Sequence, residues 1–174
     1  RRDADGVLTW QWARLLQVKH EQDINERVAA VATITAAFEV AGSGWMASDP
    51  TTITTIAVDG VQKPVLAECT GDFPASDAVL TVLSSSGTIT LVEVTGPGIE
   101  WSWAGSLLIW QSLVVDAGAL TVRKNDADAY SGFALGVGHT VAGWLTLLPG
   151  LNPLWIRVTG GSASLSLVWN ERGA

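Results

Sequence analysis

The side chains that could catalyse a reaction or bind a metal are few in this sequence, and their spacing fits neither role. The two histidines, His20 and His139, lie far apart, and neither belongs to a cluster of residues at the spacing of a zinc site. The segment Gly42-Ser43-Gly44 lacks the G-x-S-x-G spacing of a nucleophilic serine on a strand-to-helix turn. We therefore expect neither a metal centre nor nucleophilic catalysis.

Two pairs of carboxylates could support other chemistry. Asp126 and Asp128 resemble the opening of a calcium loop, but the glycine of its sixth position and the glutamate of its twelfth are missing. Glu93 and Glu100 could form a glycosidase pair, because the two carboxylates of such a pair can come from any two strands. They fit equally well as the outward half of an alternating strand. We expect that the protein is not an enzyme and binds no cofactor. A hydrolase is the alternative, if two carboxylates meet in a cleft.

Nine tryptophans against one tyrosine are the unusual feature of the composition. Large aromatic rings are typical of the core of a β-sandwich, where each buries roughly 150 to 250 Å². We expect several of the tryptophans to meet in the interior. The alternatives are an aromatic platform for a sugar, as in a carbohydrate-binding module, and an anchor at a subunit interface. The tryptophans in question are Trp101, Trp103, Trp110, Trp144, Trp155 and Trp169.

The overall composition indicates an ordered chain with a large core. Apolar residues make up 48% of the 174 residues and charged residues 16%, which suits one domain. A net charge of −7 and only ten scattered basic residues argue against nucleic-acid binding. No window approaches the eighteen apolar residues of a membrane span, so none is expected. The single cysteine, Cys69, is predicted to be a small buried apolar residue.

The elements that would position these residues are short strands separated by glycine, proline and serine turns. This spacing, without a convincing long helix, predicts an all-β, antiparallel β-sandwich or jelly roll. A short strand over 8–12 and an irregular or briefly helical segment over 14–26 would form a short N-terminal arm. The predicted division is an arm or remnant of a preceding domain over 1–27 and a sandwich over 28–174. The strands of the sandwich are predicted at 28–40, 53–58, 61–68, 78–83, 88–94, 99–104, 107–115 and 120–123.

Residues 154–169 have the clearest pattern of the chain. Apolar residues alternate with Trp155, Arg157 and Thr159 before Gly160-Gly161, and with serines after it. A period of two puts one set of residues on each face of a strand, and a glycine pair can supply the positive φ of a tight turn. We therefore predict a β-hairpin within 147–169, with an apolar face toward the core and a serine face toward water or a partner.

Four stretches of residues 27–174 follow one another in a characteristic order. The first, 27–50, opens with an arginine and closes on a Trp loop with Asp-Pro, and the second, 106–125, is a strand ending in an acidic residue with a short strand after it. A glycine-rich polar segment follows. The last and most specific stretch, 147–169, combines Leu-Pro-Gly-x-Asn with a final aromatic strand. Together the four stretches resemble the galectin-like C-terminal domain of siphophage distal tail proteins.

The resemblance implies a virion structural protein at the tail tip, where it joins the tail tube to the receptor-binding apparatus. Its partners would be copies of itself in a ring, with a hexamer expected, neighbouring tail proteins, and a surface glycan as a further candidate. The protein would be made in the cytoplasm of the bacterial host and located in the virion. Such proteins usually carry a sizeable N-terminal belt domain, whereas only residues 1–27 precede the sandwich here. Two alternatives follow: such a domain precedes Arg1, or the chain is a smaller virion protein with the same sandwich, such as a minor tail or decoration protein.

Overall fold

The computed structural model of the chain describes residues 9–21, 33–47, 49–136 and 144–173, with only the backbone described for 9–21 and 33–45. These residues form twelve strands and one short 3-10 helix, η1 (Tyr130–Gly132), and contain no α-helix. Neighbouring strands are antiparallel throughout. The predicted all-β, antiparallel sandwich is confirmed. In this part of the chain no helix is long and apolar enough to cross a membrane.

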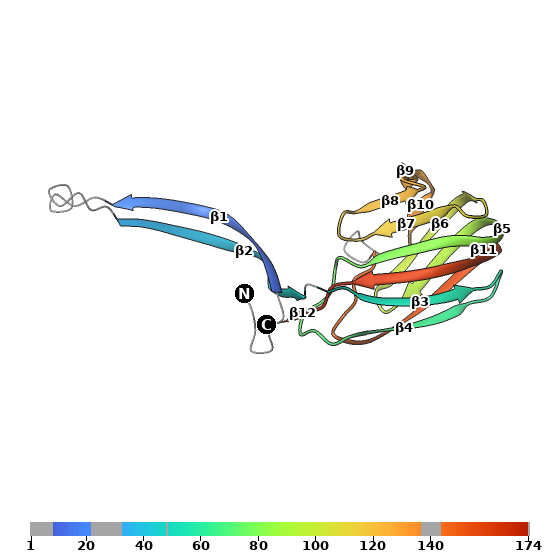
Figure 1. Cartoon of the computed structure of the whole chain (residues 1–174), viewed down its shortest axis with the longest axis horizontal. Helices are drawn as coiled ribbons and strands as arrows, with labels where there is room; N and C mark the ends of the chain where they lie inside the picture. The colour runs from blue at the N-terminus through green and yellow to red at the C-terminus, as the bar shows by residue number, and fades with distance from the viewer. Residues whose placement is uncertain (1–8, 22–32, 48, 137–143, 174) are drawn as a thin grey trace.

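The sandwich is built around two long strands that belong to both of its layers. β5 (Val79–Gly96) and β11 (Gly150–Trp169) pair with each other along most of their length, and Figure 1 shows them side by side. One layer combines the second half of β5 and the first half of β11 with β4 (Lys63–Cys69), β6 (Ile99–Leu107) and β10 (Phe133–Leu135). The other combines their remaining halves with β3 (Thr51–Ala57), β7 (Ser112–Asp116), β8 (Thr121–Lys124) and β9 (Ala127–Asp128).

The predicted hairpin within 147–169 is wrong, because β11 continues through Gly160-Gly161. Residues on both sides of this pair lie opposite β5, since Val158 faces Val92 and Leu165 faces Val82. The register shifts at the glycine pair, and Gly160 has a φ of +94°. Gly160-Gly161 therefore lies at a β-bulge rather than at a turn, with the extra residues on β5, and β11 passes from one layer into the other at this bulge.

The alternation predicted for the two halves of β11 is confirmed. Leu154, Ile156 and Val158 are buried before the bulge, and Leu165 and Leu167 are buried after it. The buried positions change from even to odd residue numbers here, because Thr159 and Gly160 are both exposed and the alternation resumes with the buried Gly161. The serine face also lies as predicted, with Ser164 exposed and Ser166 half-buried on the outside.

Several other strands are also longer than predicted, because they continue through glycines and serines that the sequence predicts to be turns. Segments 84–87 and 105–106, predicted as turns, lie inside β5 and β6. The segment 14–21, predicted to be irregular or helical, is strand. The predicted strand 107–115 is interrupted instead, because a turn precedes β7 at Ser112.

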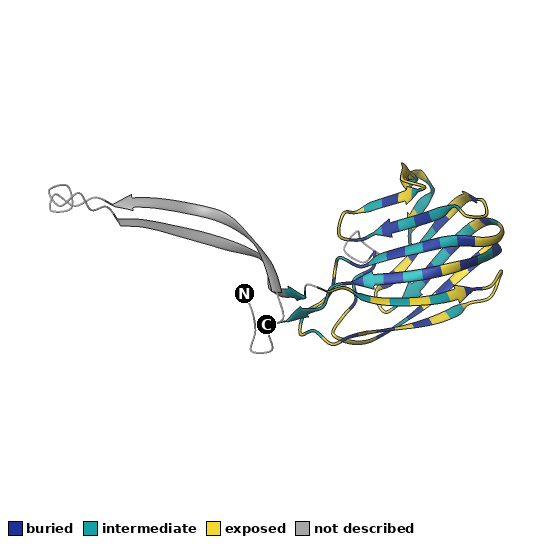
Figure 2. Cartoon of the chain, viewed as in Figure 1, coloured by how far each residue is buried: buried dark blue, intermediate teal, exposed yellow. Residues whose placement is uncertain are grey.

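The core is one continuous cluster between the two layers. Figure 2 shows buried and exposed positions alternating along the strands that enclose it. Four tryptophans belong to this cluster, namely Trp101, Trp103, Trp144 and Trp169. Trp101 and Trp144 also pack against Phe133, with ring centroids 5.4 and 4.6 Å from it. The expectation that several tryptophans meet in the interior is confirmed.

A separate ribbon extends from the sandwich. β1 (Thr9–Glu21) pairs with β2 (Thr33–Ala47), and the short β12 (Arg172–Gly173) pairs with the end of β2 nearest the body. Figure 1 shows β1 and β2 reaching away from the sandwich as a two-stranded arm. The division of the chain at residue 27 stays a prediction. β2 begins after residue 27 and pairs with β1, which precedes residue 27, and with β12.

Glu171 organises the junction between the arm and the sandwich. Its carboxylate accepts hydrogen bonds from the indole Nε1 of Trp169 (2.9 Å), the backbone N–H of Gly71 (2.9 Å) and the hydroxyl of Thr51 (3.5 Å). Its carbonyl accepts a hydrogen bond from the backbone N–H of Ala47 (2.8 Å). One residue thus connects the end of β2, the start of β3, the segment after β4 and the end of β11, so the base of the arm is fixed to the body.

Candidate interaction surfaces

The residues considered for metal binding are not gathered into a site by the described structure. No group of three or more His, Cys, Asp or Glu residues within it could hold a metal ion. Asp126 lies in the turn between β8 and β9, and Asp128 ends β9, where it accepts a hydrogen bond from the backbone N–H of Tyr130 (3.2 Å). His20 lies on β1, where only the backbone is described, and His139 lies outside the described residues.

Glu93 and Glu100 do share one face of the sandwich, as the outward half of alternating strands. Glu93 lies opposite Ser102 and Thr95 opposite Glu100, so the two glutamates are diagonal neighbours on β5 and β6. Arg157 on β11 holds the carboxylate of Glu93 in an ion pair, with both its Nε and its Nη2 2.6 Å from Oε2. Glu93 is therefore engaged with a cation on an open sheet face, which suits binding better than proton transfer.

Two tryptophans differ from the four in the core, because they are exposed. Trp110 is 76% exposed and Trp155 is 39% exposed. Trp110 and Trp155 are therefore not among the tryptophans that meet in the interior. For Trp155 the correct position follows from the alternation, since it lies between the buried Leu154 and Ile156 and so must face outward.

Trp155 lies on the outer face of the layer that contains β4. In the strand registers it is opposite Pro64 of β4 on one side and Thr95 of β5 on the other. A depression of about 220 Å³ lies beside it and is lined by Gln62, Glu93, Thr95, Trp155 and Arg157. Toward the start of β11 the same face is apolar, with Leu66 58% and Leu151 63% exposed. This face thus combines an aromatic ring, an apolar strip and a polar depression.

The turn between β6 and β7 forms a second exposed surface. Leu108, Ile109 and Trp110 are consecutive and all exposed. Trp110 has a φ of +68°, a conformation that is strained for a bulky residue. Hydrogen bonds hold the turn in place, from the backbone N–H of Trp110 to the carbonyl of Ser84 (2.9 Å) and from that of Gln111 to the carbonyl of Leu108 (2.9 Å). Sequence periodicity does not find such a turn, because its exposure depends on the backbone path.

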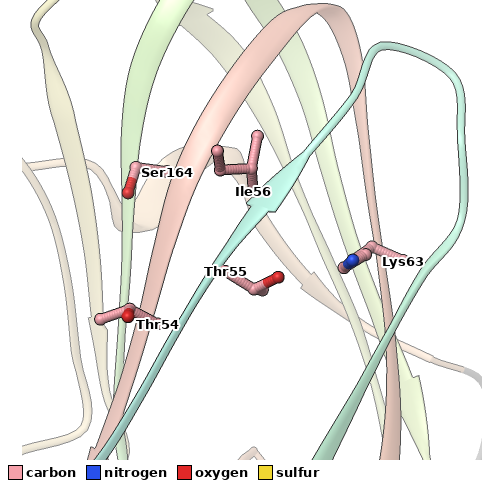
Figure 3. A pocket seen from close by; sticks show the side chains of 5 residues that line it. All are labelled: Thr54, Thr55, Ile56, Lys63 and Ser164. Carbon is pink, nitrogen blue, oxygen red and sulfur yellow. The ribbon is translucent and has the colours of Figure 1, made fainter.

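A third surface is the open edge of β3. Within the described structure β3 pairs only with β11, and its sequence TTITTIA contains no charge or proline that would hinder pairing with a further strand. A depression of about 480 Å³ along it is lined by Thr54, Thr55, Ile56, Lys63 and Ser164. Figure 3 shows Thr55 and Lys63 in the gap between β3 and β4, with Thr54 and Ser164 on the other side of β3.

Cys69 and Asn152 have structural roles. Cys69 is buried, as predicted, and burial together with the carboxylates of Glu171 and Asp77 raises the pKa of its thiol to about 11. Asn152 is buried at the start of β11, where its amide donates to the carbonyls of Leu148 (2.7 Å) and Gly150 (2.9 Å) and its Oδ1 accepts from the backbone N–H of Leu148 (2.8 Å). The asparagine of the Leu-Pro-Gly-x-Asn stretch thus shapes the loop that leads into β11.

No family model matches the chain, and no curated protein sequence matches it. Among solved structures, the chain is similar to SPP1 Dit (gp 19.1), described as a paradigm of the hub adsorption apparatus in phages that infect Gram-positive bacteria. The two share 14% sequence identity and superpose with a TM-score of 0.58, over 97% of this chain and 62% of that one. The chain therefore spans less than two thirds of the length of SPP1 Dit and shares its fold.

Proposed function

We propose that this chain is a structural component of a bacteriophage tail, a distal tail adaptor of the tail tip or baseplate that acts through protein–protein interfaces. The fold shared with SPP1 Dit supports this proposal. In it, the chain forms a ring with copies of itself, a hexamer, and contacts neighbouring tail proteins. Its location is the virion after synthesis in the bacterial cytoplasm, and its role is binding rather than catalysis.

The arm formed by β1 and β2 is the observation that carries the proposal. The strand register places apolar residues together on one face of this ribbon, where Leu15 lies opposite Phe38 and Val18 opposite Ala36. The other face is mainly polar, and there Arg14 lies opposite Glu39. This face, called the apolar face, contains seven apolar residues and His20, namely Ala13, Leu15, Val18, His20, Ile34, Ala36, Phe38 and Val40.

A two-stranded ribbon of this kind needs a partner to be stable. The 15 residues of β2 span roughly 50 Å at about 3.4 Å per residue. An isolated hairpin is marginally stable in water, because two strands alone cannot bury an apolar face. The arm extends away from the sandwich of its own chain (Figure 1). We therefore infer that the apolar face packs against a neighbouring copy in the assembly.

The test compares the molar mass of the protein with that of two matched variants. Ala36 and Ala37 are adjacent in sequence but lie on opposite faces of the arm, opposite Val18 and Gln17. A carboxylate on the apolar face disfavours packing there, because a buried unpaired charge is costly. We expect light scattering and negative-stain images to show rings for the unmodified protein and for A37D, and monomers for A36D.

Two results would contradict the proposal. A protein that stays monomeric at every concentration would argue against a ring. Equal effects of A36D and A37D would show that the apolar face of the arm does not carry the assembly. Circular dichroism of both variants must match that of the unmodified protein, because the sandwich is expected to fold independently of either change.

A further inference from the structure

We propose that the depression beside Trp155 is a saccharide-binding site, with room for a single sugar ring at a chain end or branch. The site is formed by Gln62, Glu93, Thr95, Trp155 and Arg157, on the outer face of the sandwich. It is separate from the arm, so it does not depend on the assembly proposed above.

The aromatic part of the site is held rigidly by strands. Trp155 lies within the continuous ladder of β11, with β4 paired on one side and β5 on the other. Both neighbours in sequence, Leu154 and Ile156, are anchored in the core. The backbone of Trp155 is therefore fixed, and its half-exposed indole lies on the surface, where its apolar ring face can contact the C–H face of a sugar ring.

The polar groups around the indole retain unused hydrogen-bonding capacity. The ion pair between Arg157 and Glu93 engages only Oε2 of the carboxylate, and within the described residues Oε1 of Glu93 and Nη1 of Arg157 make no hydrogen bond. A carboxylate oxygen accepts and a guanidinium donates, so the pair offers an acceptor beside a donor. Adjacent hydroxyl groups of a sugar can donate to the acceptor and accept from the donor. The ion pair also orients both side chains before the ligand arrives, which lowers the entropy lost on binding.

The loop that supplies Gln62 is fixed to β11 next to the site. The carboxylate of Asp59 accepts a hydrogen bond from the backbone N–H of Gly160 (2.7 Å), and the backbone N–H of Gly60 donates to the carbonyl of Val158 (2.8 Å). The amide of Gln62 and the hydroxyl of Thr95 can both donate and accept. Three parts of the chain, the β3–β4 loop, β5 and β11, therefore converge on one small depression.

Charge and size favour a neutral sugar over other ligands. Glu93 compensates the charge of Arg157, so the depression offers no net positive charge to a phosphate or sulfate. Its volume of about 220 Å³ lies below the roughly 300 to 1,000 Å³ of sites for drug-sized ligands. An aromatic face with a few convergent polar groups is the usual construction of a small-molecule site. A ring with one apolar face and a rim of hydroxyls matches each of these features.

The experiment is saturation-transfer difference NMR on the full chain. The probes are the methyl glycosides of glucose, galactose, N-acetylglucosamine and rhamnose at millimolar concentration. We expect transfer to at least one of them, loss of that transfer in W155A and E93Q, and full retention in W110A. Trp110 is the matched control, because it is also an exposed tryptophan but lies outside the depression. Trp155 and Glu93 both lie on the surface, so W155A and E93Q are expected to fold.

Three outcomes would overturn the site. The absence of transfer from every probe, confirmed by an empty glycan array, would exclude saccharide binding. Transfer that persists in W155A would place the binding elsewhere. A change in molar mass in W155A would mean that the face around Trp155 contacts protein. The variants A36D and A37D test the ring proposal separately, so either proposal can fail without the other.

Discussion

At the scale of single residues, the position within a strand decides what a tryptophan does. Trp101 and Trp103 are two residues apart, face the same way and are buried. Trp155 has the same chemistry but is out of phase with the buried residues of β11, and it lies on the surface. The alternation in the sequence contains this information for Trp155. It contains none for Trp110, which is exposed by the turn between β6 and β7.

Cys69 gives a prediction for the pH dependence of stability. Its pKa is raised from 9.0 to about 11 in the folded protein, mainly by burial and also by Glu171 and Asp77. Between these two pH values the unfolded chain loses the thiol proton while the folded protein keeps it. The unfolded state then binds fewer protons, so the free energy of unfolding should fall as the pH rises from 9 toward 11.

The measurement is urea unfolding at a series of alkaline pH values, with Cys69→Ala as the control. The variant lacks the ionising group, so the part of the pH dependence that arises from the thiol should disappear from it. An identical decline in both proteins would mean that Cys69 does not contribute. The thiol should also resist alkylation below pH 9 in the folded protein and react readily once urea unfolds the chain.

At the scale of elements, the bulge at Gly160-Gly161 explains where the sequence interpretation failed. A glycine pair between two alternating runs is consistent with a hairpin turn and with a bulge, because both use its conformational freedom. What distinguishes them is the partner strand. β5 continues past this point, and its own Gly87 lies opposite Gly161 with a φ of +68°. The two long strands bend together, and the sequence pattern of β11 alone does not specify this bend.

The bulge predicts a strong position dependence of glycine substitutions. A Cβ on Gly161 would lie 2.0 Å from the carbonyl oxygen of Ser86, so G161A must displace the backbone of β5. A Cβ on Gly98 would meet nothing within 4 Å, and only its positive φ opposes alanine. We expect G98A to lose about 1 kcal/mol of unfolding free energy and G161A to lose about 2 kcal/mol or more. Urea unfolding measures both, and equal losses would argue against the close approach of the strands at the bulge.

At the scale of the whole molecule, the chain combines a body with its own core and an arm without one. Every buried apolar residue of the core cluster lies between Ala57 and Trp169, within the part of the chain whose burial is described. The arm is connected to this body through β12 and Glu171. The sandwich therefore has what it needs for folding, whereas the arm relies on its surroundings.

This organisation predicts the behaviour of a truncated chain. Residues 49–174 alone should fold cooperatively, because they retain the entire core cluster, and should be monomeric, because they lack the arm. Tryptophan fluorescence during heating measures the first property and light scattering the second. An unfolded fragment would show that the arm is part of the folding unit. A fragment that still forms rings would place the assembly contacts on the sandwich.

The sequence by itself determined the strand content, the faces of most strands and the burial of Cys69. These follow from alternation and residue type, which act locally and have a fixed period. Only the tertiary structure decided that β11 is one bent strand, that Trp155 meets Glu93 and Arg157, and that 33–47 pairs with 9–21 outside the sandwich. Each of these depends on which strand lies beside which. Pairing joins residues that are distant in the chain, and a local pattern does not specify its partner.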